Sequence, residues 1–173
     1  MGARGLVVNG EQWKAALEDP AVVARYWSKV VKTDSCWWWG GALMRSGHGR
    51  FWVGTDSVTG RDLVVIAHRF GWAATHGLDA LVEVPVLAHK CDEALCQRPD
   101  PQHVRPSTST ANREEWLASR WRFGSPLRDT RGRAGRARAI RDAVRHGEDP
   151  AVAQAAGLSQ LDRDQLALPL DLG

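Results

Sequence analysis

Near its start the chain repeats apolar residues at the spacing of an amphipathic helix. Between residues 9 and 31 the apolar face is formed by Trp13, Leu17, Val23, Tyr26 and Trp27. Asn9 is suited to cap the first turn, and Pro20 stands where a second helix would begin. The pattern therefore predicts a helical N-terminal segment over residues 1–35.

Short strands and helices alternate in the middle of the chain. The stretch CWWWGGALMRSGHGRFWVG (36–54) has aromatic runs around a glycine-rich connection, which predicts a β-hairpin. Residues 61–77 begin as an apolar strand and continue as a helix closed by a glycine. An apolar strand over 82–89 would deliver His89 at its end. Residues 107–121 predict a helix whose start is marked by Ser and Thr.

Arginine dominates the part of the chain that follows. Residues 107–147 carry ten arginines against four acidic residues, whereas residues 148–173 carry one arginine against five acidic residues. Between residues 131 and 147 apolar positions recur at helical spacing, which predicts a basic helix within an arginine-rich segment, 124–148. For residues 149–173 we expect a short helix followed by a flexible acidic tail.

A block of positive charge made only of arginine suits contact with the phosphates of DNA. The alternative is a solvated helical face, because many charge runs are no more than that. The candidate residues for DNA contact are Arg131, Arg133, Arg136, Arg138, Arg141 and Arg145.

Length and composition fit an ordinary soluble protein. The chain has 173 residues, which is enough for one well-buried domain and an appendage. Its net charge is +3. No apolar run approaches the ~20 residues that span a bilayer, and the N-terminus lacks the apolar core of a secretory signal. We expect a cytoplasmic protein without membrane contact.

Two of the three cysteines fall in the stretch HKCDEALCQRPDPQH, residues 89–103. Cys91 and Cys96 are separated by four residues, and His103 follows, so this loop can wrap a tetrahedral Zn²⁺ if a fourth ligand arrives from elsewhere. Cys36 is the remaining cysteine and would complete a closed, structural Cys₃His site. Two alternatives stay open: buried free thiols beside a surface histidine, or His89 as a zinc ligand.

The stretch AHKCDEALCQRPDPQHV, followed nine residues after His103 by Asn112, resembles the HNH endonucleases, also called His-Me finger or ββα-metal nucleases. The similarity is to homing and phage-type members with a zinc-binding loop. Upstream, CWWWGG…GHGRF and AHRFGWAATHG resemble the CWxWxG…GYGRF and AHRxxW…HG segments of phage-type members. The resemblance spans residues 36–120. It implies an α+β fold: a small ββα-metal nuclease core with a zinc-stabilised loop over 36–123, flanked by N- and C-terminal helices.

By this resemblance His89 is the general base that takes a proton from water, and Asn112 holds a catalytic Mg²⁺ at the scissile phosphate. Arg50 and Arg69 are candidates for stabilising the transition-state charge, against the alternative of surface or structural arginines. DNA is the implied substrate, with 5′-phosphate and 3′-hydroxyl products, in the nucleoid of a bacterial or phage-infected cell. The implied ligands of the structural Zn²⁺ are Cys36, Cys91, Cys96 and His103.

Two features depart from the family pattern. Ala88 stands where many members have Asp or His as a second metal ligand, which leaves Asn112 as the lone protein ligand of Mg²⁺. Two extra residues lie between Cys96 and His103, so the loop must bulge for His103 to reach the zinc. The alternative function is therefore a catalytically inactive, zinc-stabilised DNA-binding or adaptor module. A non-nuclease zinc ribbon would need a second Cys pair, and symmetric double-strand cleavage would need a homodimer.

Other residues could also serve DNA or a partner. Trp37, Trp38 and Trp39 either stack on bases or are buried near the zinc region. We interpret His68 as a hydrogen-bonding residue of the fold.

The tail QLALPL resembles the short peptide by which bacterial replication and repair proteins dock on the sliding clamp. The alternative is a tail without a partner. The anchors of the peptide would be Gln165, Leu166, Leu168, Pro169 and Leu170.

Overall fold

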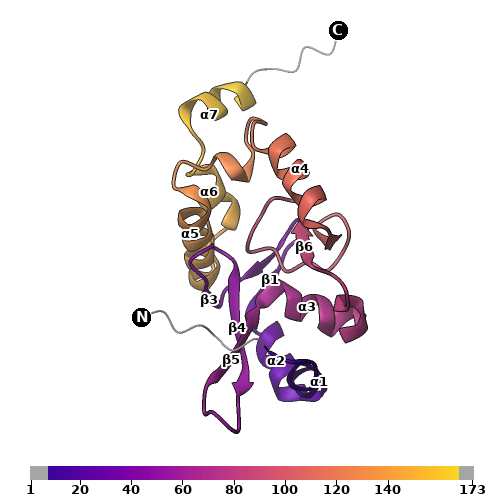
Figure 1. The fold of residues 1–173 in the computed structure, drawn as a ribbon. Helices are drawn as coiled ribbons and strands as arrows, with labels where there is room; N and C mark the ends of the chain where they lie inside the picture. The colour runs from indigo at the N-terminus through magenta and orange to yellow at the C-terminus, as the bar shows by residue number, and fades with distance from the viewer. Residues whose placement is uncertain (1–7, 168–173) are drawn as a thin grey trace.

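The computed structural model describes residues 8–167 of the chain (Figure 1). The helices are α1 (Gly10–Glu18), α2 (Pro20–Trp27), α3 (Ala67–His76), α4 (Ser109–Ser119), α5 (Gly132–His146), α6 (Pro150–Ala155) and α7 (Gln160–Ala167), with 3₁₀ turns η1 (Leu78–Leu81) and η2 (Pro126–Arg128). The strands are β1 (Val30–Lys32), β2 (Trp37–Trp39), β3 (Ala42–Leu43), β4 (Gly49–Thr55), β5 (Asp62–Ile66), β6 (Val86–His89) and β7 (Val104–Ser107). None of the described helices combines the length and apolar composition needed to cross a membrane.

The chain is a mixed α+β fold with three small antiparallel sheets. The sheets have the orders β1–β2, β3–β4–β5 and β6–β7. Each sheet pairs strands that are neighbours in sequence, so the sheets arise from local pairing, and their relative placement depends on packing and on the loops.

The two N-terminal helices form where the sequence predicts them. Asn9 and Gln12 make a reciprocal capping box at the start of α1, and the Asp19 side chain accepts from the Ala21 amide to cap α2. Beyond these helices, residues 30–32 are a strand rather than the end of a helix. Val31 pairs with Trp38, because β-branched and aromatic side chains pack well across a sheet.

The glycine-rich region is not one hairpin over 36–54. The strand β2 pairs backward with β1, whereas β3 pairs forward with β4. The turn between β2 and β3 is fixed by Trp39, whose Nε1 donates to the Ala42 carbonyl at 2.9 Å. A Cβ on Gly41 would lie 2.4 Å from the Trp39 ring, so only glycine allows this close turn. The strand β5 and helix α3 match the prediction for 61–77.

One hydrophobic cluster joins the parts of the chain that the sequence divides into segments. Tyr26 of α2 lies at its centre, with ring centroids 5.4 Å from Trp39, 5.3 Å from Phe51 and 5.1 Å from Phe70. Ile140 of α5 is buried in the same cluster. The N-terminal helices, the β1–β2 and β3–β4–β5 sheets and the arginine-rich helix therefore share a core, whereas Leu87 of β6 and Val104 of β7 belong to a second cluster.

The tryptophan run faces inward for the most part. Trp38 is 2% exposed and Trp39 is fully buried. Of the three, only Trp37 is partly accessible, so stacking of all three on bases is wrong. Both buried rings belong to the central hydrophobic cluster.

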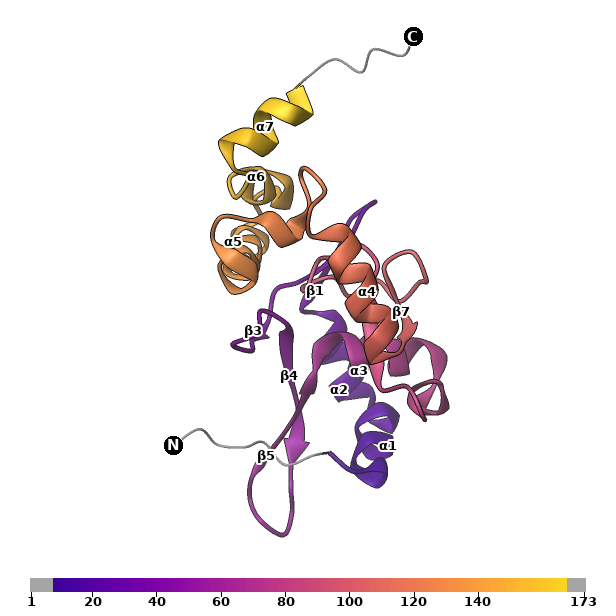
Figure 2. The same ribbon diagram turned by 45° about the horizontal axis from the view of Figure 1, so that its top comes forward.

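The C-terminal segment continues as helix where the sequence predicts a flexible tail. Residues 160–167 form α7, which follows α6 at one end of the molecule (Figure 2). Asp162 is fully buried and accepts hydrogen bonds from the Gly124 amide and from Arg128 Nε. Gln165 and Leu166 of the clamp-like peptide are exposed at the end of α7. Its other anchors, Leu168, Pro169 and Leu170, lie outside the described residues.

Replacing Gly71 by alanine should destabilise the fold. A Cβ at this position of α3 would lie 2.1 Å from the Tyr26 hydroxyl, so the central tyrosine must move. We expect Gly71→Ala to lower the free energy of unfolding by about 1–3 kcal/mol, measured by denaturant unfolding. Gly10→Ala in α1, where nothing lies within 4 Å, is the matched control and should leave stability equal or slightly higher. Equal stability of the two variants would contradict the role of Tyr26 as the packing centre.

Candidate functional site: a histidine pocket beside a metal cluster

Four residues from three parts of the chain meet at one point and could hold a metal ion. Cys36 precedes β2, Cys91 and Cys96 lie in the loop after β6, and His103 precedes β7. Their ligand atoms all lie within 4.8 Å of one another. The Nδ1 atom of His103 is 3.6 Å from the Cys36 sulfur and 3.5 Å from the Cys96 sulfur. A tetrahedral Zn²⁺ with ordinary bond lengths would separate sulfur and nitrogen ligands by about 3.5 Å.

The long loop between Cys96 and His103 folds into a turn that returns His103 to the cluster. The Asp100 carbonyl accepts from the His103 amide, and its carboxylate accepts from the Gln102 amide, both at 2.9 Å. The extra residues of this loop are therefore accommodated by a turn built on Asp100, as the predicted bulge requires.

The first cysteine is tied to this loop by hydrogen bonds between backbones and from an arginine. The Gln97 amide donates to the Trp37 carbonyl at 2.7 Å, and the Trp39 amide donates to the Leu95 carbonyl at 3.1 Å. Arg98 donates from Nη1 to the carbonyls of Asp34 and Ser35. The segment around Cys36 is thus held against the loop through its backbone, whether or not the cluster holds a metal.

The three thiols perturb one another because they are so close. Hydrogen bonds from Cys36 and Cys91, with backbone amides, lower the pKa of Cys96 to about 4. Hydrogen bonds to Cys91 and Cys96 and burial raise the pKa of Cys36. Without a cation such a cluster resists full ionisation, and a bound cation would favour the thiolate form of each ligand. The donor set of three sulfurs and one imidazole suits zinc.

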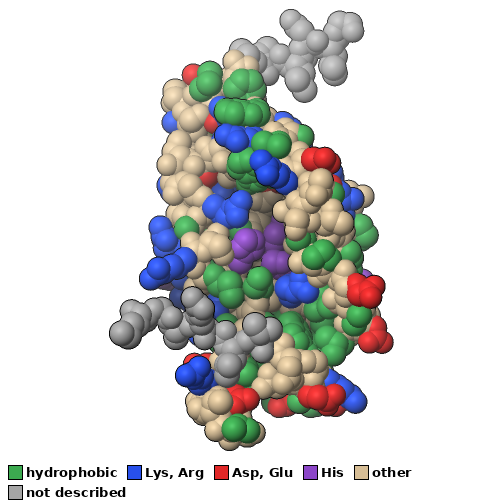
Figure 3. Space-filling model, in the orientation of Figure 1, with side chains coloured by type: hydrophobic (Ala, Val, Ile, Leu, Met, Phe, Trp, Pro, Cys, Tyr) green, Lys and Arg blue, Asp and Glu red, His purple; other side chains and the backbone are tan. Residues whose placement is uncertain are grey.

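A pocket of about 270 Å³ opens beside this cluster, at the end of β6. His48, His68 and His89 form one part of its wall, and Figure 3 shows histidines in a hollow of the surface with basic side chains on both sides. Asn112 of α4 and Asp92 of the metal-binding loop also line the pocket. The site therefore combines residues from a turn, a strand, a loop and two helices.

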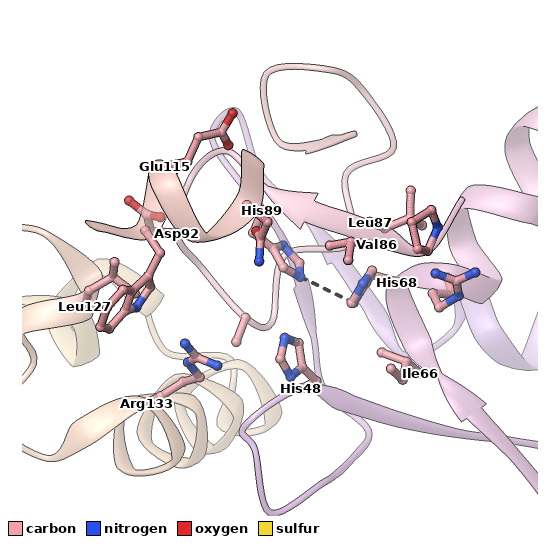
Figure 4. A pocket seen from close by; sticks show the side chains of 15 residues that line it. His48, Ile66, His68, Val86, Leu87, His89, Asp92, Glu115, Leu127 and Arg133 are labelled. Carbon is pink, nitrogen blue, oxygen red and sulfur yellow. Dashed lines mark hydrogen bonds between the residues drawn. The ribbon is translucent and has the colours of Figure 1, made fainter. Parts of the chain in front are cut away.

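The three histidines lie close enough to interact. Nε2 of His89 is 3.3 Å from Nδ1 of His68, and their ring centroids are 4.5 Å apart (Figure 4). The His48 ring lies 5.6 Å from His68 and 5.8 Å from His89. Nδ1 of His48 is hydrogen-bonded to the Ser46 hydroxyl at 3.0 Å.

Burial keeps these imidazoles neutral. Desolvation is the largest cause that lowers the pKa of His89, His68 and His48. The positive charge of Arg133, which lies opposite the histidines in Figure 4, lowers the pKa of His48 and His89 further. All three side chains are therefore unprotonated near neutral pH and have a nitrogen lone pair to donate.

The structure brings some predicted site residues together and leaves others apart. His89, Asn112 and Arg69 line the pocket. Arg69 is half-buried and donates from Nη2 to the Val84 carbonyl at 3.2 Å. Arg50 does not line the pocket. Side chains of β4 alternate between the two faces of the sheet, and Arg50 lies on the exposed face, between the buried Gly49 and Phe51.

Sequence reasoning missed His48, Asp92 and Arg133 as pocket residues. His48 had a visible signal, since GHGRF carries histidine where the similar family segment GYGRF carries tyrosine. Asp92 had none: its backbone adopts φ 60°, in the left-handed region, in the loop between the two cysteines. Arg133 was predicted to contact DNA, and its place in the pocket comes from the docking of α5.

The arginine-rich helix is only partly free for DNA. Arg136 is buried and pairs with Glu93 of the metal-binding loop and with Asp129. Arg131 also pairs with Asp129, at 2.7 Å, and donates to the Ala153 carbonyl. Both guanidinium groups are paired inside the protein, so they have less charge to offer DNA than the exposed arginines of α5, and their contact with DNA stays a prediction.

The other predicted arginines of α5 differ in their accessibility. Arg141 pairs with Asp142, and Arg145 donates to the Gly40 carbonyl while staying exposed. Arg133 and Arg138 are exposed. These last two are the residues best placed to meet an anion.

Comparisons of the chain with protein-family models, with curated proteins and with solved structures found no match. Functional assignment therefore depends on the geometry of the site.

Removing one ligand should release the metal from the cluster. We expect the purified protein to contain about one zinc ion per chain and His103→Ala to lose it, with loss of cooperative unfolding. His146→Ala, an exposed histidine at the end of α5, is the matched control and should retain the metal. Metal analysis and thermal unfolding of both variants measure this. Full zinc content in His103→Ala would show that the ion binds elsewhere.

Replacing Arg136 should lower the stability of the protein far more than replacing Arg138 on the same helix. Arg136→Ala leaves Glu93 buried without a cation, while Asp129 keeps its pair with Arg131, and this should cost about 3–5 kcal/mol in the free energy of unfolding. Arg138→Ala removes an equal charge from an exposed position and should change it by less than about 0.5 kcal/mol. Denaturant unfolding of the two variants decides the point. Comparable losses would mean that the ion-pair network contributes no more than a surface charge.

Proposed function

We propose that this protein is a metal-dependent DNA endonuclease of the HNH type, built on a ββα-metal core. The observation that carries the proposal is the pairing of His89 with Asn112 in one pocket. His89 ends β6, the antiparallel strand β7 follows, and Asn112 lies on α4, which packs on β6. This order of two strands and a helix, with these two residues facing one cavity, is the arrangement that the family resemblance implies.

His89 is suited to act as the general base. Burial lowers its pKa, so the ring is neutral near pH 7 and can accept a proton. In the proposed reaction it takes a proton from water as the water oxygen bonds to phosphorus. The bond from phosphorus to the 3′ oxygen then breaks, and this oxygen takes a proton from solvent. The products are a 5′-phosphate and a 3′-hydroxyl.

The donors of the pocket fit a hard divalent cation. Asn112 offers an amide oxygen and Asp92 a carboxylate, and oxygen is the ligand that Mg²⁺ prefers. These two residues would hold the ion, which when bound neutralises charge on the phosphate and the leaving oxygen. Asp92 also accepts a hydrogen bond from Arg122 at 3.1 Å. That contact keeps the carboxylate placed.

Arginines around the pocket suit a phosphate backbone. Arg133 lines the pocket opposite the histidines and can stabilise negative charge on the reacting phosphate. Arg138, exposed on the same helix, can contact a neighbouring phosphate without choosing a sequence. Cleavage with little dependence on sequence follows from such contacts.

One observation favours a second function. Ala88 is buried beside His89, so the base has no acidic neighbour in sequence to share a metal. A zinc-stabilised module that binds DNA without cutting it would tolerate this residue. The difference between the two functions is whether the pocket supports catalysis.

Cleavage of supercoiled plasmid tests the proposal. With Mg²⁺ the wild type should nick the plasmid, and His89→Ala and Asn112→Ala should each lower the rate by about 100-fold or more, because the base and a metal ligand are lost. His146→Ala changes an exposed histidine at the end of α5, outside the pocket, and should cut like the wild type. Zinc content measured on the same samples separates catalytic loss from unfolding.

The outcomes of this assay are distinct. Nicking that survives in His89→Ala would end the assignment of the base. DNA binding with zinc retained and no cleavage would support the binding module instead.

A further inference from the structure

An arginine and two tryptophans form a stack at the end of α4. The guanidinium carbon of Arg120 lies 4.5 Å from the ring centroid of Trp116 and 4.5 Å from that of Trp121. A cation over an aromatic face is attracted to it, so the arginine holds both rings in place. Trp121 is nonetheless 67% exposed. Its ring is therefore positioned by the fold and left uncovered by residues 8–167.

The stack lies in line with the pocket. Asn112, Trp116 and Arg120 are four residues apart, so they lie on one face of the helix in successive turns. Between Asn112 and Arg120 the helix rises roughly 12 Å, which is the length of about three nucleotide steps along one DNA strand. Trp116 itself lines the pocket. A strand whose phosphate lies in the pocket can therefore reach the stack with its next few nucleotides.

A second hollow adjoins the pocket beside the stack. It has a volume of about 440 Å³ and shares Trp116, Leu127 and Arg133 with the pocket, and Arg45 also lines it. Both hollows are therefore bordered by an aromatic ring and a cation, the two groups that single-stranded nucleic acid uses for binding.

The charge around the stack suits a polyanion. Asp92 and Glu115 are the acidic residues of the pocket wall, and each is already paired with an arginine. Glu114 lies on the opposite side of α4 from the face that carries the stack. In the described part of the chain no acidic residue forms an ion pair with Arg120, so its positive charge remains available to a phosphate.

The combination of an uncovered ring and an available cation distinguishes between two forms of DNA. In a duplex the faces of the bases are covered by neighbouring base pairs, and a protein surface meets phosphates, sugars and base edges. Unpaired bases expose their faces and stack on aromatic side chains with little dependence on sequence. The stack therefore fits a strand with unpaired bases better than a continuous duplex.

We propose that Trp116, Arg120 and Trp121 form a stacking platform for unpaired DNA bases beside the phosphate that occupies the pocket. Binding of single-stranded DNA to this platform does not depend on catalysis. The further statement, that DNA with unpaired bases next to the cleaved bond is the preferred substrate, rests on the proposed function.

Binding of labelled oligonucleotides without added Mg²⁺, followed by fluorescence anisotropy, tests the platform. Trp121→Ala should weaken binding of single-stranded oligothymidylate about tenfold or more, because a base loses its stacking partner. It should leave binding of an abasic strand of equal length unchanged, since that strand has phosphates but no bases. Trp121→Phe keeps an aromatic face and should retain most of the affinity for oligothymidylate.

Trp52→Ala is the matched control. Trp52 is also an exposed tryptophan stacked against an arginine, Arg25, but it does not line the pocket. This variant should bind the strand like the wild type. Equal losses in the two alanine variants would overturn the platform, and so would unchanged binding by Trp121→Ala or a loss that is as large for the abasic strand. A dimer that Trp121→Ala converts to a monomer, with DNA binding unchanged, would identify a second copy of the chain as the occupant.

Cleavage with Mg²⁺ tests the substrate preference. The wild type should cut a duplex that contains a run of unpaired bases faster than a fully paired duplex of the same length, and Trp121→Ala should lose this preference. Equal cutting of the two substrates by the wild type would overturn the preference. If the wild type binds single strands through Trp121 but cuts no DNA, the proposed function fails while the platform stands.

Discussion

The meeting of Cys36, Cys91, Cys96 and His103 is the constraint on which the rest of the site depends. These residues come from segments far apart in sequence, and none of the three small sheets alone would hold them together. His89 lies two residues before Cys91, so fixing the sulfur fixes the end of β6. A metal bound by these four residues would add cohesion between segments that are far apart in sequence.

The loop that carries these ligands also docks the arginine-rich helix. Glu93 lies between Cys91 and Cys96 and accepts from Arg136 and from Gln154 of α6. A buried ion pair contributes little net stability relative to apolar packing, but any arrangement that separates its members leaves a buried charge unpaired and is strongly destabilised. The pair therefore specifies where α5 sits, and that position places Arg133 in the pocket. The Glu93 carboxylate therefore links the position of the Cys₃His cluster to the position of Arg133 in the pocket.

Much of the secondary structure could be predicted from local pattern, and little of the pocket could. The spans of α1, α2, α3 and β6 follow from capping residues, glycine and apolar runs that act over a few positions. Cysteine and histidine spacing predicted the cluster because so few residue types bind zinc. The role of Arg136 was out of reach, since its partner Glu93 lies 43 residues earlier and a charge run does not reveal which members are buried.

The α7 helix shows the same limit. The acidic composition of residues 160–167 predicts a solvated tail, yet Asp162 is the residue that anchors it, through Gly124 and Arg128. The charge of Asp162 suggested an exposed position, because its partners Gly124 and Arg128 lie more than 30 residues earlier in the sequence. For the same reason β1 was missed, because its pairing with Trp37–Trp39 is set by the sheet and not by its own three residues.

The pocket is lined by two kinds of polar group from different elements. Oxygen atoms come from Asn112 on α4 and Asp92 in the loop, and nitrogen atoms come from His48, His68 and His89. Burial acts on both sets, but in opposite directions for their charge: it raises the pKa of Asp92 and lowers the pKa of the histidines, so each group moves toward its neutral form. A neutral histidine is a better base and ligand, whereas a carboxylate must stay ionised to bind a cation. Arg122, which donates to Asp92, offsets the cost for the carboxylate. No acid pairs with the histidines in the described pocket, and their neutrality is the property that proton transfer to His89 needs.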